Sequence, residues 1–110
     1  MRSLMLLSVI SLAALIATSA RAQEDIGDPK AGAIVASEIC AFCHAVSPEQ
    51  RMSPILEAPR FEDVANTSGM TAMALFAWMT TSHPTMPNII LDPEDLRNVV
   101  AYILSLQEQQ

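Results

Sequence analysis

Hydrophobic and polar positions along the chain predict helices joined by proline-marked loops. In the last segment, apolar residues recur at spacings of three and four, which marks one face of an amphipathic helix: Leu96, Val99, Val100, Ile103 and Leu104. Asp92-Pro93 precedes this segment and combines an N-cap residue with proline at the first helical position. Asp28-Pro29 carries the same signal. We therefore predict helices from Pro29 to Ile39 and from Pro93 to about Leu106.

The middle of the chain predicts two more helices between loops. Residues 60–67 are compatible with a short helix, and residues 71–81 form a helical stretch that is apolar on most sides. Residues 41–59 and 83–91 contain five of the seven prolines, which predicts a loop and an extended segment. Since no alternating strand pattern is visible, the predicted fold class is all-α, in a single domain.

The N-terminus has the features of an export signal. Arg2 precedes a 14-residue stretch of apolar and small residues from Leu4 to Ala17, and Ala20-Arg21-Ala22 gives an A-x-A cleavage pattern. The apolar run is short for a membrane span, which needs about 20 residues. We predict a signal peptide over residues 1–22, a mature domain over residues 23–110 without stable membrane insertion, and a periplasmic location.

Composition limits the possible functions. The chain has 110 residues, of which 51% are apolar and 16% charged, and this excludes a disordered protein. The formal net charge of −6 argues against nucleic-acid binding, which requires basic residues that neutralise phosphates. So small a helical domain buries little surface and often needs a covalent or metal cross-link for stability.

The sequence Cys40-Ala41-Phe42-Cys43-His44 suggests what stabilises it. This is the C-x-x-C-H pattern of covalent c-type haem attachment. Two thiols at this spacing can add to the two vinyl groups of one haem, and the adjacent histidine can coordinate its iron. The haem also supplies an apolar disc around which helices can pack.

Three other interpretations use the same residues. A disulfide oxidoreductase also carries C-x-x-C, but its βαβ pattern is not visible here. A zinc site could use Cys40, Cys43, His44 and His83, although adjacent Cys43 and His44 chelate awkwardly. A structural disulfide is the simplest alternative, since thiols tend to be oxidised in the periplasm.

From Asp28 to Leu106, the sequence resembles the small bacterial monohaem class I cytochromes c. Besides the C-x-x-C-H motif, four features carry the resemblance: a glycine eight residues before Cys40, an aromatic-bearing segment in the last helix, a proline loop, and a distal segment with a Met-Pro pair. Here these are Gly32, Val100-Ala101-Tyr102-Ile103, Ala58-Pro59-Arg60-Phe61 and His83-Pro84-Thr85-Met86-Pro87. In the family, the glycine lets the first and last helices cross closely at the aromatic ring. The aromatic residue that the family often has at position 36 is alanine in this chain.

The resemblance implies a set of site residues. Cys40 and Cys43 would form two thioethers to one haem c, with His44 and Met86 as the iron ligands. Pro59, in Ala58-Pro59-Arg60-Phe61, would accept a hydrogen bond from His44 Nδ1 through its carbonyl group, and such a bond fixes the tautomer of a ligating histidine. Arg51 and Arg60 are candidates for pairing with haem propionates, or are solvated surface residues.

Two side chains near the predicted distal site have competing interpretations. Trp78 could donate its indole N–H to a propionate or could pack in the core against the haem plane. His83 is the rival to Met86 as distal ligand, or is a loop histidine near the haem edge. The other candidate methionines are assigned elsewhere: Met73 and Met79 to core packing, and Met52 and Met70 to partly exposed positions near loops.

The implied function is one-electron transfer without catalysis. Iron with both axial positions filled exchanges electrons but does not readily bind a small ligand, and His/Met ligation raises its potential. The acidic surface would steer basic docking patches on a redox donor and acceptor, and the protein would be a monomer. The alternative is a haem-based sensor or ligand binder, in which the bond to Met86 is weak.

Overall fold

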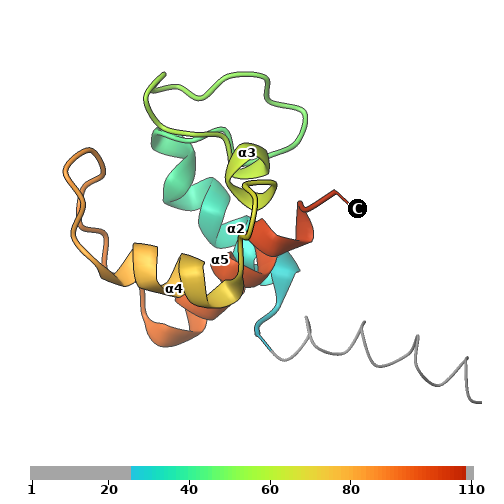
Figure 1. The fold of residues 1–110 in the computed structure, drawn as a ribbon, viewed down its shortest axis with the longest axis vertical. Coiled ribbons are helices and arrows are strands. Elements are labelled where there is room, and N and C mark those ends of the chain that lie inside the picture. The colour runs from blue at the N-terminus through green and yellow to red at the C-terminus, as the bar shows by residue number, and fades with distance from the viewer. Residues whose placement is uncertain (1–25, 109–110) are drawn as a thin grey trace, which may run out of the picture.

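The structure is a computed structural model that describes residues 26–108, and in this range it contains helices and no strand. The elements are α2 (Pro29–Glu38), the short 3₁₀ helix η1 (Cys40–Phe42), α3 (Phe61–Ala65), α4 (Ala72–Thr80) and α5 (Pro93–Ser105). Long loops connect η1 to α3 and α4 to α5 (Figure 1). The predicted all-α fold is confirmed. The predicted signal peptide lies outside the described residues.

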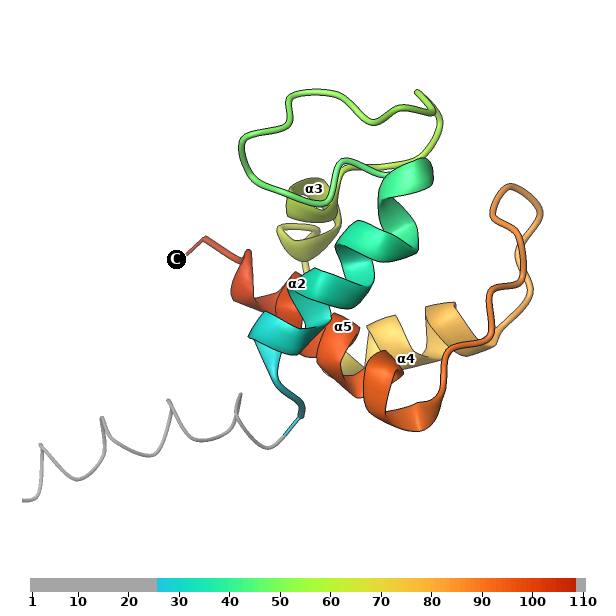
Figure 2. The same ribbon diagram turned by 180° about the vertical axis from the view of Figure 1, so that it is seen from behind.

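Helices α2 and α5 cross at the centre of the molecule and make the most extensive contact between any two elements (Figures 1 and 2). Gly32 lies at the crossing. A Cβ atom there would lie 1.9 Å from the carbonyl oxygen of Asn98 and 2.8 Å from Cβ of Tyr102. The expected approach of the first helix to the last at Gly32 and Tyr102 is therefore confirmed.

Side-chain caps set the start of both crossing helices. Asp28 accepts a hydrogen bond from the backbone N–H of Lys30 at 2.8 Å, and Asp92 accepts from Glu94 and Asp95 at 2.9 and 3.0 Å. The proline that follows each aspartate does not cost the helix a hydrogen bond, because the first backbone N–H of a helix has no acceptor within the helix. Both predicted starts are confirmed, and both helices end within a residue or two of the predicted ends.

The core lies where α3 and α4 pack against the α2–α5 pair. The buried apolar residues come from every helix and from the loop after η1: Ala36, Cys40, Ala45, Val46, Phe61, Ala65, Leu75, Val99, Val100, Ala101, Ile103 and Leu104. Ala36 is fully buried, so a larger side chain there would have to displace its neighbours. The absence of an aromatic ring at position 36 thus suits the packing of this chain.

Candidate functional site

The C-x-x-C-H segment is folded into one compact turn at the end of α2. The carbonyl of Cys40 accepts hydrogen bonds from the backbone N–H groups of Cys43 at 3.1 Å and His44 at 2.9 Å. This turn presents two thiols and an imidazole within five residues. The thiols are not joined by a disulfide.

The two thiols differ in their surroundings. Cys40 is only 8% exposed, and burial raises the pKa of its thiol to about 11. Cys43 is half-buried. Desolvation disfavours the thiolate, which is the reactive form of cysteine, so Cys40 is the less reactive of the two in this conformation.

The imidazole of His44 is oriented by a hydrogen bond to a distant part of the chain. Its Nδ1 lies 2.7 Å from the carbonyl oxygen of Pro59. A carbonyl group can only accept, so Nδ1 carries the proton and donates it, which leaves the Nε2 lone pair free for a metal. The predicted contact between His44 and Pro59 is present. The roles of both residues at a haem stay predictions.

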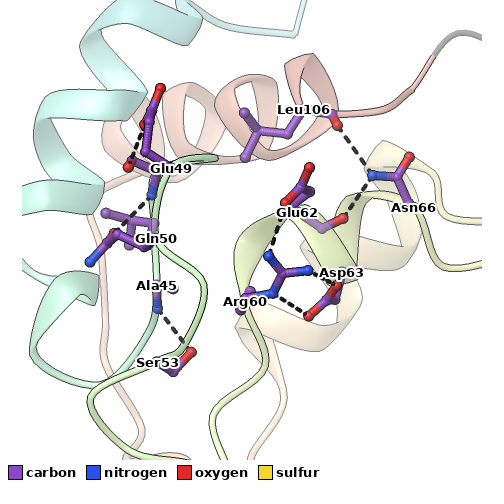
Figure 3. Close-up of polar contacts among 11 residues, drawn as sticks. Ala45, Glu49, Gln50, Ser53, Arg60, Glu62, Asp63, Asn66 and Leu106 are labelled. Carbon is purple, nitrogen blue, oxygen red and sulfur yellow. Dashed lines mark hydrogen bonds and ion pairs between the residues drawn. The ribbon is translucent and has the colours of Figure 1, made fainter.

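Side chains of the loop bind the backbone of the residues that follow His44 (Figure 3). The hydroxyl of Ser53, which is buried, accepts from the backbone N–H of Ala45 at 2.9 Å, and the Gln50 amide oxygen accepts from Val46 at 2.9 Å. At the start of α3, Phe61 N–H donates to the carbonyl of Ala45 at 2.9 Å. Two hydrogen bonds thus join the His44 segment to the Pro59 segment: the Phe61 bond to Ala45 and the bond from His44 to Pro59.

Sequence reasoning did not identify Ser53, Gln50 or Phe61 as residues that position the site. A weak signal existed only for Gln50, because Ser47-Pro48 favours a turn, and Gln50 N–H closes that turn on the Ser47 carbonyl. The Ser53 contact joins the loop to Ala45 through tertiary structure. The ring of Phe61 lies 5.4 Å from that of His44, and this pair also depends on the fold.

Arg60 is paired within α3 and is not free to bind a propionate in this conformation. Its guanidinium contacts Glu62 at 3.1 Å and Asp63 at 2.6 Å (Figure 3). These contacts, with Asp63 foremost, raise the pKa of Arg60. The structure therefore favours the surface interpretation of Arg60, and Arg51 is also exposed.

A second group of candidate residues lies at the end of α4 and in the loop that follows. His83 and Met86 face each other in an antiparallel backbone bridge, and the ring of His83 stacks on Trp78 with centroids 4.5 Å apart. Both His83 and Met86 are half-buried. No hydrogen bond, ion pair or ring contact within residues 26–108 links these three residues to Cys40, Cys43, His44 or Pro59.

The outward face of α4 corrects one expectation. Met73 is 81% exposed, so its interpretation as core packing is wrong. Trp78 is 59% exposed, and its contact with a haem stays a prediction. The inward face is also apolar, because Ala72, Leu75, Phe76 and Met79 pack on the core. Of the two loop methionines, Met70 is half-buried against the core and Met52 is exposed.

These exposed apolar surfaces fit a large apolar cofactor. A helix that is apolar on both faces is normally covered on both. Phe42 in η1 and Ile90 in the loop before α5 are also exposed, at 79% and 87%. The Nε2 atoms of His44 and His83 have no hydrogen-bond partner among residues 26–108. Together with them, the exposed side chains provide apolar contact area and nitrogen lone pairs of the kind that haem requires.

The zinc interpretation lacks the geometry it needs. Among the described residues, no group of three or more His, Cys, Asp or Glu side chains comes close enough to hold a metal ion. Cys40, Cys43 and His44 share one turn, but His83 belongs to the other group of candidate residues.

Comparison with known proteins identifies the family. Over 76 residues, the chain is 32% identical to a protein named cytochrome c-552 from Bradyrhizobium diazoefficiens, a match that covers 69% of this chain and 72% of that protein. The chain belongs to the cytochrome c family. No protein-family model and no solved structure matches it.

The helical structure is that of a cytochrome c domain. Helices α2 and α5 cross at a glycine, and the C-x-x-C-H turn follows α2. None of the helices in residues 26–108 is both long and apolar enough to cross a bilayer.

Proposed function

We propose that this chain is a periplasmic monohaem class I cytochrome c that carries one electron at a time between redox proteins. The observation that carries this proposal is the 2.7 Å hydrogen bond from His44 Nδ1 to Pro59, beside two unbridged cysteines in a C-x-x-C-H turn. A fixed tautomer with an unprotonated Nε2 is the state of histidine that ligates a metal.

Cys40 and Cys43 would hold the haem covalently. Each thiol adds across one vinyl C=C bond, so that sulfur bonds to one carbon and the thiol hydrogen goes to the other, with no net oxidation. The compact turn keeps both sulfurs within one short segment. Their attachment fixes the cofactor next to His44 and would cover part of the surface around Phe42.

His44 and Met86 would be the axial ligands. The bound haem supplies a single redox-active iron whose two states differ by one electron. With His44 and Met86 bound in both states, the iron would have no open position at which oxygen or peroxide could react, which is why we propose a carrier rather than an enzyme. The thioether of Met86 would raise its reduction potential.

Trp78 would complete the distal side. Its indole N–H makes no hydrogen bond within residues 26–108, and its ring is largely exposed. An indole that becomes covered usually finds an acceptor. A haem propionate is an acceptor of suitable charge, so we assign this contact to Trp78.

The surface charge suggests how partners are recognised. The net charge is −6, and Asp92, Glu94 and Asp95 gather at the start of α5. The carboxylate of Asp92 is used locally as a cap, but its charge still contributes to the field. Basic patches on an electron donor and acceptor would be steered by this field, in small and short-lived interfaces.

The test is spectroscopy of the protein produced in a host with haem-attachment machinery. Mass spectrometry should show one haem per chain. The oxidised protein should show the long-wavelength charge-transfer band of a sulfur-to-iron bond, and the reduced protein should not bind carbon monoxide.

Substitutions then assign the ligand. Met86→Leu should abolish the charge-transfer band, and Met79→Leu, at a half-buried methionine of α4, should keep it. A high-spin wild-type spectrum that shifts with carbon monoxide would refute the carrier and support the ligand-binding alternative. Absence of covalent haem would refute both.

A further inference from the structure

The loop between α4 and α5 contains a second potential iron ligand three residues before Met86. His83 and Met86 form an antiparallel bridge across Pro84 and Thr85. Residues that face each other in an antiparallel pair project their side chains to the same side of the ribbon, with Cβ atoms about 4.5–5.5 Å apart. A haem iron that the Met86 side chain binds would therefore lie on the side of the turn to which the His83 side chain also projects.

The imidazole of His83 is in the ligating tautomer. Its Nδ1 lies 3.0 Å from the carbonyl oxygen of Thr81, which can only accept, so Nδ1 carries the proton. Its Nε2 therefore holds a lone pair. This atom is buried and has no hydrogen-bond partner among the described residues. Buried polar atoms in folded proteins nearly always have a partner, and one without a partner requires an explanation.

The ring is also held in place. It stacks on Trp78 at a centroid distance of 4.5 Å and an interplanar angle of 35°. The Thr81 bond and the Trp78 contact restrain the imidazole from two directions. A surface histidine with no role beyond solubility would need neither restraint, and its Nε2 would be solvated.

We propose that His83 is a reserve distal ligand that takes the sixth coordination position of the haem iron whenever Met86 is not bound to it. This inference rests on the proposed function, since it requires a haem with Met86 as the resident ligand. It gives the loop two stable ligation states. In the second state the iron stays low-spin and closed to small molecules, and its potential is lower because imidazole replaces the thioether.

A methionine thioether takes one oxygen atom from a peroxide and becomes the sulfoxide, while hydrogen peroxide is reduced to water; this changes a soft sulfur donor into a polar group. A reserve ligand would then keep the protein a closed electron carrier at a lower potential. Without one, loss of the Met86 bond would leave an open iron that binds ligands.

The experiment compares four haem-loaded proteins: wild type, Met86→Leu, His83→Ala, and the double variant. Leucine has a volume similar to that of methionine and offers no lone pair, so it removes the ligand with little repacking. The readouts are the spin state from optical and electron paramagnetic resonance spectra, the carbon monoxide affinity of the reduced form, and the reduction potential.

We expect His83→Ala to keep the sulfur-to-iron band. Met86→Leu should lose that band but remain low-spin with two nitrogen ligands, at a lower potential than the wild type. The double variant should become high-spin. If His83 occupies the iron in at least about 90% of Met86→Leu molecules, the double variant should bind carbon monoxide at least about tenfold more tightly.

Other outcomes overturn the proposal. A wild type with the sulfur-to-iron band and a high-spin Met86→Leu variant would refute the reserve ligand but leave the proposed function intact. A double variant that stays low-spin would also refute it. A wild type that lacks the band and becomes high-spin in His83→Ala would make His83 the resident ligand and refute both assignments. If Met86→Leu does not retain haem, the same comparison is made between wild type and His83→Ala after both have been oxidised at Met86. Peptide mass spectrometry verifies the oxidation.

Discussion

Replacing Gly32 with alanine tests the helix crossing on which the site is built. Alanine normally stabilises a helix interior relative to glycine, by roughly 0.5–1 kcal/mol. Here the new Cβ would lie 1.9 Å from the Asn98 carbonyl oxygen and 2.4 Å from its carbon, both of them backbone atoms. Ordinary contact begins at 3.4 Å, so α5 would have to retreat by about 1.5 Å at this point.

The clash should exceed the gain in helix propensity. Overpacking in a core costs typically 1–3 kcal/mol, and the upper end applies because a backbone segment must move. After the helix gain is subtracted, we expect Gly32→Ala to be destabilised by about 2 kcal/mol. That corresponds to a decrease in Tm of roughly 8–16 °C for a domain of this size.

Thermal and urea unfolding followed by far-ultraviolet circular dichroism measure the effect. Ser37→Ala, on the exposed side of the same helix, is the matched control and should change stability by no more than about 0.5 kcal/mol. If Gly32→Ala is as stable as the wild type, or more stable, then the close crossing of α2 and α5 is wrong.

Three further predictions concern individual contacts. Tyr102→Phe removes the 2.6 Å bond from the phenol to the Val46 carbonyl and should cost about 1 kcal/mol in urea unfolding, whereas an unchanged midpoint would contradict that contact. Asp92→Ala should destabilise α5 at neutral pH, because the N–H of Asp95 and that of Glu94 lower the pKa of the Asp92 carboxyl group. That stabilisation is complete above the ordinary carboxyl pKa of 3.8, and it is lost as the pH falls through the lowered pKa that Asp92 has in the folded protein. The unfolding curves of the wild type and of Asp92→Ala should therefore converge in acid and not in base. In the haem-free chain at pH 8, iodoacetamide should alkylate Cys43 faster than Cys40. The Cys40 pKa of about 11 makes the thiolate fraction of Cys40 about a hundredfold smaller than it would be at the ordinary value of 9.0. Peptide mass spectrometry gives both rates, and equal rates would contradict the burial of Cys40.

Local signals in the sequence were sufficient to predict most of the helix boundaries. Asp28-Pro29 and Asp92-Pro93 each place a capping carboxylate and a proline where a helix begins, and both caps form. These are contacts between residues two or three positions apart, so they do not depend on the rest of the fold. The crossing at Gly32 was predictable only through the family resemblance, because the clash partners are 66 and 70 positions away.

The long-range side-chain contacts could not be predicted in the same way. Nothing in the sequence distinguishes Ser53 from the other polar residues of the loop. Only the folded loop brings its hydroxyl to the N–H of Ala45. The same holds for the bond from Tyr102 to Val46, across 56 positions. The motif identified Cys40, Cys43 and His44, but it carried no information on how the loop supports them.

The expectation that failed has a physical cause. The sequence pattern predicts Met73 in the core because apolar side chains in a helix usually pack on other parts of the protein, yet α4 already packs Leu75 and Phe76 on the core. Met73 lies outside that packed face. Within residues 26–108, a hydrogen bond to Pro59 orients His44, whereas Met73 and Trp78 of α4 are exposed. Protein contacts in this part of the chain therefore suffice to orient the predicted proximal ligand. The predicted distal side is left with exposed apolar area and with a buried imidazole nitrogen that has no partner among the described residues, both of which a haem would satisfy.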